Sequence, residues 1–284
     1  MIANYHTHTW RCRHADGTER EYVERAIEGG LKILGFSDHS PYPFPDGYDS
    51  GMRMRLDQVE GYVDTVLALK KEYDKDIEIH LGLETEYFPR FWDQLIDFLS
   101  DYPFEYFVLG QHSLGNEIEK ILYSGHGTTD GSYLKQYVDQ CLAGIDTGKY
   151  LYLAHPDLFL FNGDEAVFDR EYRRLCREVK KRNIPLEINF LGLMEERWYP
   201  NEKFWKIAGE EGNTAVFEIY RPFWGIGPKF LFYMVAYLMF LYFSFIMIAF
   251  IIECAKFNIP IQLFPMLKIA GLNCMIMGAF IGAS

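Results

Sequence analysis

The chain has 284 residues, enough for one large domain or for one domain with an appended segment. It carries 28 Lys and Arg against 40 Asp and Glu, a formal net charge of −12, which argues against a nucleic acid as partner. Residues 223–284 contain Lys229, Lys256, Lys268 and Glu253, a net charge of +2, so residues 1–222 carry −14. The composition therefore changes near residue 222.

Short apolar stretches that are rich in β-branched and aromatic residues alternate with helical patterns over residues 1–220. Each stretch is typical of a buried strand. The predicted strands are Ile2–His6, Leu31–Ser37, Ile77–Glu84, Tyr106–Gln111, Tyr150–His155, Pro185–Phe190 and Thr214–Tyr220.

Helical patterns fill the intervals between these strands. Thr18 and Glu21 have the spacing of a capping box, which opens a helix that ends at Gly29 and Gly30. Further helices are predicted over Leu56–Lys70, Arg90–Leu99, Tyr133–Ile145, Glu165–Arg182 and Asn201–Glu211. Repeated alternation of strand and helix predicts an α/β fold, in which a parallel sheet closes into a (β/α) barrel.

The last part of the chain has a different character. The segment Phe230–Ile252 contains no charged residue and is long enough to cross a bilayer. We expect it to span a membrane, because a buried helix is rarely apolar on every face over such a length. The next stretch, Ile259–Ile281, is interrupted by prolines and a lysine, which indicates a poorer second span or a re-entrant segment. The sequence thus predicts a domain at 1–222 followed by an apolar membrane anchor at 223–284.

The cysteines and the N-terminus indicate where the main domain resides. The chain begins without a cleavable signal and leads directly into a histidine pair. An odd number of cysteines without close spacing indicates reduced thiols and a cytoplasmic main domain. We interpret all five as small packing residues: Cys12, Cys141, Cys176, Cys254 and Cys274.

Histidines recur directly after the predicted strands. Imidazole is the commonest side-chain ligand for divalent transition metals, and residues i and i+2 of a strand share a face, so His6 and His8 can hold one ion together. In a parallel barrel the carboxyl ends of all strands meet at one rim. The pattern therefore predicts a multinuclear metal site at this rim, with the candidate ligands His6, His8, His39, Glu84, His112 and His155.

A carboxylate at this rim can bridge two cations, and two cations about 4 Å apart can clamp the oxygens of a phosphate ester. Glu84 and Glu86 share a strand face, so spacing alone does not separate the bridge from a supporting carboxylate, and we favour Glu84. The predicted nucleophile is a metal-bound water positioned by Glu84, His112 and His155. Arginine suits phosphate oxygens, and the candidates are Arg197, Arg53 and Arg55.

Over about residues 1–213 the chain resembles the histidinol phosphatases of the PHP (polymerase and histidinol phosphatase) superfamily. The resemblance rests on the segment His6–His14 and on the motifs Gly35-Phe36-Ser37-Asp38-His39-Ser40-Pro41, Gly82-Leu83-Glu84, Gly110-Gln111-His112-Ser113 and Ala154-His155-Pro156-Asp157. It implies a distorted (β/α)7 barrel whose two to three divalent ions (Zn, Mn or Fe) hydrolyse L-histidinol phosphate, a small-molecule phosphate monoester of histidine biosynthesis.

The resemblance also implies how the ligands are shared. His6, His8 and Glu84 would hold one ion, and Glu84 would bridge to a second ion held by His112 and His155. His14 and His39 would hold the third ion.

The chain departs from the family at its last strand. The family ends that strand in a Gly-Ser-Asp-Ala-His-like motif whose Asp and His complete two metal sites, whereas Tyr220 and Pro222 stand at those positions here. We therefore expect the last strand–helix unit to be replaced by the hydrophobic tail, the third ion to be held loosely and the activity to be impaired. The alternatives are a catalytically impaired metal-binding module on a membrane anchor and another PHP-type phosphoesterase.

Overall fold

The computed structural model describes residues 2–119 and 121–218. The predicted span at 230–252, the second apolar stretch, Tyr220 and Pro222 all lie outside the described residues. Among the helices of the described ranges, none is long and apolar enough to cross a membrane. The membrane anchor and the domain boundary at residue 222 stay predictions.

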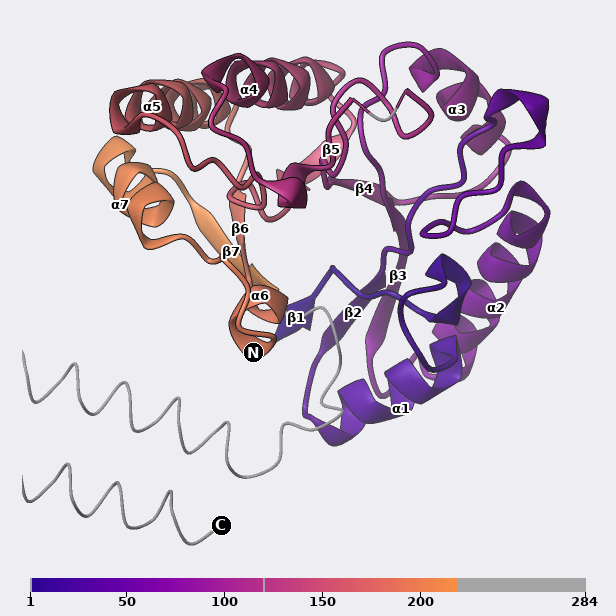
Figure 1. Cartoon of the computed structure of the whole chain (residues 1–284). Coiled ribbons are helices and arrows are strands. Elements are labelled where there is room, and N and C mark those ends of the chain that lie inside the picture. Colours follow the sequence, from indigo (N-terminus) through magenta and orange to yellow (C-terminus); the bar gives the residue numbers. More distant parts are fainter. Residues whose placement is uncertain (1, 120, 219–284) are drawn as a thin grey trace, which may run out of the picture. The chain divides into compact units, whose positions relative to one another are not determined.

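Parallel strands form one seven-stranded sheet in the described part of the chain, and their order in the sheet follows the sequence. They are β1 (Ala3–Asn4), β2 (Ile33–Phe36), β3 (Glu78–Glu84), β4 (Tyr106–Leu109), β5 (Tyr150–Leu153), β6 (Leu186–Asn189) and β7 (Ala215–Glu218). The sheet curls into a nearly closed barrel with its helices on the outside (Figure 1). The predicted α/β class and the distorted (β/α)7 barrel are confirmed.

The predicted helices are present, with ends that shift by a few residues. They are α1 (Glu19–Glu28), α2 (Val59–Glu72), α3 (Trp92–Leu99), α4 (Gly131–Asp146), α5 (Glu165–Lys181) and α7 (Glu202–Glu211). The capping box at the start of α1 is formed, because the Thr18 and Glu21 side chains each accept the other residue's backbone N–H. The connections also contain the short 3-10 helices η1 (Trp10–Cys12), η2 (Pro45–Gly47), η3 (Leu56–Gln58) and η4 (Ser124–His126).

One helix was not predicted. The short helix α6 (Phe190–Met194) begins directly after β6, with no intervening loop. The Asn189 side chain caps it by accepting the Leu191 N–H at 2.9 Å. We predicted a strand as far as Phe190, but this cap ends the strand and starts the helix at the barrel rim.

The apolar residues form two layers. A large layer packs the outward faces of the strands against the helices, and a smaller cluster of Val108, Tyr152 and Ala154 is joined by Tyr5, Tyr106 and Val216. Because side chains alternate along a strand, Tyr106 and Val108 of β4 belong to the smaller cluster while Leu109 belongs to the larger layer. On β4 the small cluster therefore lies on the strand face opposite to the larger layer.

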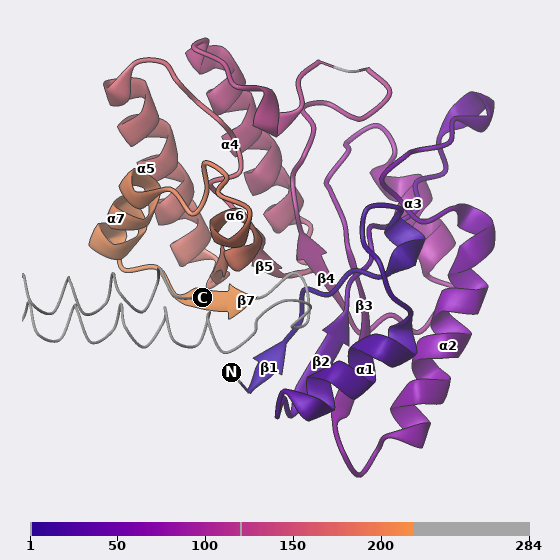
Figure 2. The ribbon, with the colours of Figure 1, turned by 60° about the horizontal axis from the view of Figure 1, so that its bottom comes forward.

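The parallel register places the ends of neighbouring strands together. Glu84 at the end of β3 pairs with Val108 of β4 on one side, and it forms an isolated bridge with His39 on the other. Every neighbouring pair of strands in the sheet is parallel, and the arrows of β1 and β2 can be seen to point toward the same end (Figure 2). The predicted ligands that follow different strands are therefore gathered at one rim.

Candidate metal centre

The Glu84 carboxylate lies at the middle of the predicted ligands and is only 1% exposed. Its Oε2 atom lies 3.2 Å from Nε2 of His6, 3.0 Å from Nε2 of His8 and 3.1 Å from Nδ1 of His39. The nitrogens of His6 and His8 are themselves 3.0 Å apart. Three imidazoles from the ends of two strands thus converge on one oxygen.

The other oxygen of Glu84 faces a second pair of imidazoles. Its Oε1 atom lies 3.0 Å from Nε2 of His155 and 3.7 Å from Nε2 of His112. Both histidines are largely buried. Glu84 therefore presents one oxygen to each of two imidazole clusters.

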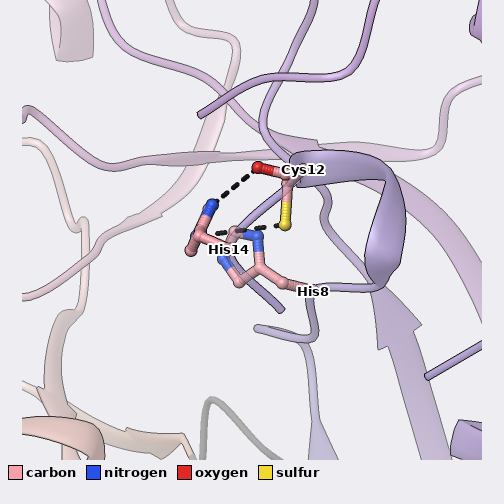
Figure 3. Close-up of side chains that lie close together, drawn as sticks. All are labelled: His8, Cys12 and His14. Atoms are coloured by element: carbon pink, nitrogen blue, oxygen red, sulfur yellow. Dashed lines mark hydrogen bonds between the residues drawn. The ribbon is translucent and has the colours of Figure 1, made fainter. Parts of the chain in front are cut away.

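This donor set fits divalent cations. Zinc–ligand bonds of about 2.0–2.1 Å in tetrahedral geometry put neighbouring ligand atoms roughly 3.3 Å apart, close to the separations around Oε2. Three groups of residues in the described ranges have candidate ligand atoms that all lie within 4.8 Å of one another. They are the group of His6, Glu84 and His155, the group of His8, His39 and Glu84, and the group of His8, Cys12 and His14, which is drawn in Figure 3. The first two groups share Glu84, as expected of a bridging carboxylate.

The electrostatics also suit a cation. Burial lowers the pKa of His8 to about 3 and holds the pKa of His39 well below its ordinary value, so both rings offer neutral lone pairs. Burial alone would raise the pKa of the Glu84 carboxyl, but the positive charges of His6 and His112 outweigh it and hold that pKa well below its ordinary value. In turn, the neighbouring carboxylates outweigh burial and raise the pKa of His6 and His112, so a bound cation would take the place of their ring protons. A buried negative charge is thus surrounded by nitrogen donors.

A carboxylate behind the ligands was missed by the sequence analysis. Glu187 of β6 is fully buried, and its Oε1 accepts the Nδ1–H of His6 at 2.6 Å. Its Oε2 accepts the backbone N–H of His155 at 2.8 Å. The bond to His6 leaves Nε2 of that ring directed at Glu84, which is how a supporting carboxylate orients a metal-ligating imidazole. The signal in the sequence was the period-two pair Glu187 and Asn189 within an otherwise apolar strand.

Replacing Glu187 with Gln should weaken divalent-metal binding by about tenfold or more, because one amide oxygen cannot serve both His6 and His155. Metal titration of the full chain checks this. The matched control is Glu60→Gln on the exposed side of α2, which should leave the affinity unchanged. Equal affinity in both variants would show that Glu187 does not position the ligands.

His155 has a backbone φ of 28°, a left-handed conformation that side-chain-bearing residues rarely adopt. Such strain costs on the order of 1–3 kcal/mol and persists only where the surroundings enforce it. The N–H bond to Glu187 and the following Pro156 hold the turn in place. The strained turn directs the His155 ring at Glu84.

Gly110 makes room for the carboxylate. A Cβ atom added at Gly110 would lie 1.7 Å from Oε1 of Glu84 and 2.6 Å from its Cδ, both far inside contact distance. This position at the end of β4 must therefore be glycine for Glu84 to reach the centre.

Glu86 occupies a supporting position. Its Oε1 lies 3.2 Å from Nδ1 of His112, on the side of that ring away from Glu84, and it accepts an Nη2–H of Arg53 at 2.5 Å. Because Glu84 and Glu86 are two residues apart on one strand face, their spacing left open which of them is the bridging ligand. In the structure Glu84 lies among the imidazoles, whereas Glu86 lies behind His112.

The three candidate arginines have different surroundings. Arg53 is 1% exposed, and its guanidinium donates to the carboxylates of Glu86 and, at 2.6 Å, Glu117. It does not line the cavity that opens over the predicted metal ligands. Arg55 pairs with Asp57 on the exposed surface. Only Arg197 of the three lines the cavity.

A cavity of about 330 Å³ opens over the imidazoles. Its metal side carries His39, Glu84, His112 and His155, and His14 lies at the same cavity. Its opposite walls are formed by aromatic and aliphatic side chains and by a charged pair, namely Tyr123, Leu158, Leu191, Tyr199, Glu195 and Arg197. The volume suits a small molecule with an anionic group.

His14 lies beside His39 and His8. Its ring centroid is 4.8 Å from that of His39 and 5.5 Å from that of His8, and it is grouped with His8 and Cys12. Two further histidines do not belong to the predicted ligand set. His80 lies between Glu78 and Glu105, and His126 is in η4.

Buried imidazoles around a shared carboxylate, at the carboxyl rim of a parallel barrel, define a (β/α)-barrel protein suited to divalent metal ions. The chain belongs to the PHP domain family, whose model matches residues 4–190.

Several known proteins are similar to this chain. The histidinol-phosphatase of Bacillus subtilis is 31% identical over 181 residues, which are 61% of this chain and 58% of that protein. The "Probable histidinol-phosphatase" of Deinococcus radiodurans is 30% identical over 144 residues, 51% of each chain. The matched parts thus span between half and three fifths of these two relatives.

Two solved structures share the fold. A chain from Listeria monocytogenes has a TM-score of 0.61 at 23% identity, over 80% of this chain and 98% of that chain. The histidinol phosphate phosphatase of Lactococcus lactis, complexed with zinc, L-histidinol and phosphate, has a TM-score of 0.58 at 21% identity, over 77% of this chain and 86% of that chain. These likenesses establish the barrel architecture.

Proposed function

We propose that this chain is a metal-dependent phosphomonoesterase that converts L-histidinol phosphate and water to L-histidinol and phosphate, a reaction of histidine biosynthesis. The observation that carries the proposal is the Glu84 carboxylate, with one oxygen 3.0–3.2 Å from the nitrogens of His6, His8 and His39 and the other 3.0 Å from His155. The name of the Bacillus subtilis relative and the ligands of the Lactococcus lactis structure support the same substrate.

The proposed centre holds two to three divalent ions, of which zinc is favoured by the nitrogen-rich donor set and present in the Lactococcus lactis structure. His6, His8 and His39 surround one oxygen of Glu84, while His112 and His155 flank the other. When bound, divalent ions lower the pKa of water to give a nucleophile near neutral pH and neutralise phosphate charge. Glu84, His112 and His155 position that nucleophile in our proposal.

Substrate binding is assigned to the walls of the cavity. Arg197 supplies a guanidinium to the phosphate side, where it also donates to Glu195 at 2.5 Å. Tyr123, Leu158 and Tyr199 offer an apolar and aromatic surface to the organic part of the substrate. Arg53 and Arg55 have no part in this proposal because their guanidinium groups pair with carboxylates away from the cavity.

The free, buried thiols Cys12, Cys141 and Cys176 support a cytoplasmic location for the barrel. Attachment to a membrane through residues 230–252 remains a prediction from the sequence, outside the described residues.

Phosphate release from L-histidinol phosphate tests the function. We expect the full chain to release phosphate in a chelator-sensitive reaction, and the double variant Tyr220→Asp with Pro222→His to react faster, on the order of a hundredfold, because misplaced reacting groups carry a penalty of that size. A general phosphate monoester serves as the control substrate.

The outcomes separate the competing functions. Chelator-sensitive release from the control substrate alone would support another phosphoesterase. Metal binding without any hydrolysis, in either chain, would support the impaired metal-binding module and contradict the proposed activity.

A further inference from the structure

A buried arginine joins three of the loops at the rim. Arg53 lies in the connection between β2 and α2 and is 1% exposed. Its Nη2–H donates at 2.5 Å to Oε1 of Glu86, which follows β3. Its Nε–H donates at 2.6 Å to Oε2 of Glu117, in the connection between β4 and α4. One guanidinium thus ties the segments after β2, β3 and β4 to one another.

Two aromatic rings lie against this guanidinium. Its central carbon is 5.5 Å from the centroid of the Tyr42 ring and 5.3 Å from that of the Phe88 ring, distances at which a cation is attracted to an aromatic ring. The Tyr42 hydroxyl also donates to the backbone carbonyl of Glu86. Both aromatic residues are buried, so Arg53 has little room to change its partners.

Glu86 connects Arg53 to a metal ligand. Its Oε1, the atom that accepts from Arg53, lies 3.2 Å from Nδ1 of His112. Its Oε2 accepts the backbone N–H of Ser113 at 3.2 Å, which fixes the plane of the carboxylate. A carboxylate on the Nδ1 side of an imidazole keeps a proton there and leaves the Nε2 lone pair for a cation. In His112 it is Nε2 that faces Glu84.

The position of His112 makes this support important. Its Nε2 lies 3.7 Å from Glu84, whereas the facing nitrogens of the other four imidazoles lie 3.0–3.2 Å from that carboxylate. Metal–ligand distances vary by only about 0.2 Å, so a small rotation of the His112 ring would take Nε2 out of reach of an ion beside Oε1 of Glu84.

We propose that Arg53 is a positioning residue for the ion that His112 and His155 flank, because it holds Glu86 in the orientation that directs His112 at that ion. In this role Arg53 acts on metal binding and does not contact the substrate. The inference rests on the metal centre proposed above. The ion placed among His6, His8 and His39 lies outside this chain of contacts, so only one of the two ions beside Glu84 should depend on Arg53.

Zinc titration of the full chain tests the proposal in a double-mutant cycle. The variants are Arg53→Met, Glu86→Met and the combination of both. Each single variant should bind one of two zinc ions about tenfold more weakly, and the other ion should keep its native affinity. Because Arg53 acts through Glu86, the double variant should also lose only about tenfold, whereas two independent effects would multiply to about a hundredfold.

Thermal melting separates this role from a purely structural one. Removing one member of a buried ion pair leaves a charge without its partner, so each single variant should melt at a lower temperature than the native chain. The double variant carries two apolar side chains in place of the pair and should recover most of that loss, while its zinc affinity should not recover. The matched control is Arg174→Met, which removes a guanidinium from the buried carboxylate of Glu171 in α5 and should keep both zinc ions.

Arg53→Lys guards against misfolding of Arg53→Met. It keeps the buried charge but lacks the planar fork that reaches Glu86 and Glu117 together, so it should again weaken one zinc ion. Native zinc affinity in the double variant or in every folded Arg53 variant would show that the pair serves the fold alone. An additive loss of about a hundredfold would show that Arg53 acts without Glu86. Either result would overturn the proposal and leave the Glu84 centre standing, whereas failure of the native chain to bind two zinc ions would overturn both.

Discussion

Replacing Glu84 with Gln should strip the chain of most of its bound divalent metal and lower any phosphatase activity by at least about a hundredfold. The amide keeps the size of the side chain but has a single oxygen and no charge. Its NH2 group would point hydrogens at nitrogens that now lie 3.0–3.2 Å from a carboxylate oxygen. Metal analysis after dialysis, together with phosphate release, measures the effect.

The matched control for Glu84→Gln is Glu78→Gln, the same substitution at the other end of β3. Glu78 is exposed and pairs with His80, outside the ligand groups, so this variant should keep its metal. Circular dichroism of both variants separates loss of ligand from loss of fold. A folded Glu84→Gln chain that retains native metal content would refute the bridging role of Glu84.

The sequence predicted those features that depend on local patterns. Strands and helices follow from short-range periodicity, and the rim follows from their alternation, because parallel strands bring the residues after them to one end of the barrel. His6, His39, Glu84, His112 and His155 therefore came together as predicted.

Long-range partners could not be predicted in this way. Arg53 pairs with Glu86 and Glu117, which lie 33 and 64 positions away in the sequence, and this pairing takes it out of the cavity despite its place in a loop near the ligands. Glu187 supports His6 across 181 positions.

Gly110→Ala should reproduce the loss of metal that we expect of Glu84→Gln, although it changes no ligand. The added methyl group would lie 1.7 Å from Oε1 of Glu84, whose carboxylate is enclosed by imidazoles and cannot retreat without leaving them. Overpacking of this kind costs about 1–3 kcal/mol, and each kcal/mol lowers the melting temperature of a domain of this size by about 2–4 °C. The expected result is a lower melting temperature together with reduced metal content.

The control for this variant is Gly209→Ala in α7, where an added Cβ meets no atom within 4 Å. Alanine is the better helix former by roughly 0.5–1 kcal/mol, so this variant should melt slightly higher and keep its metal. The pair separates crowding at the carboxylate from a general effect of adding a methyl group. If Gly110→Ala kept native metal content and stability, Glu84 would have room to move, and the tightly enclosed centre proposed for this barrel would be wrong.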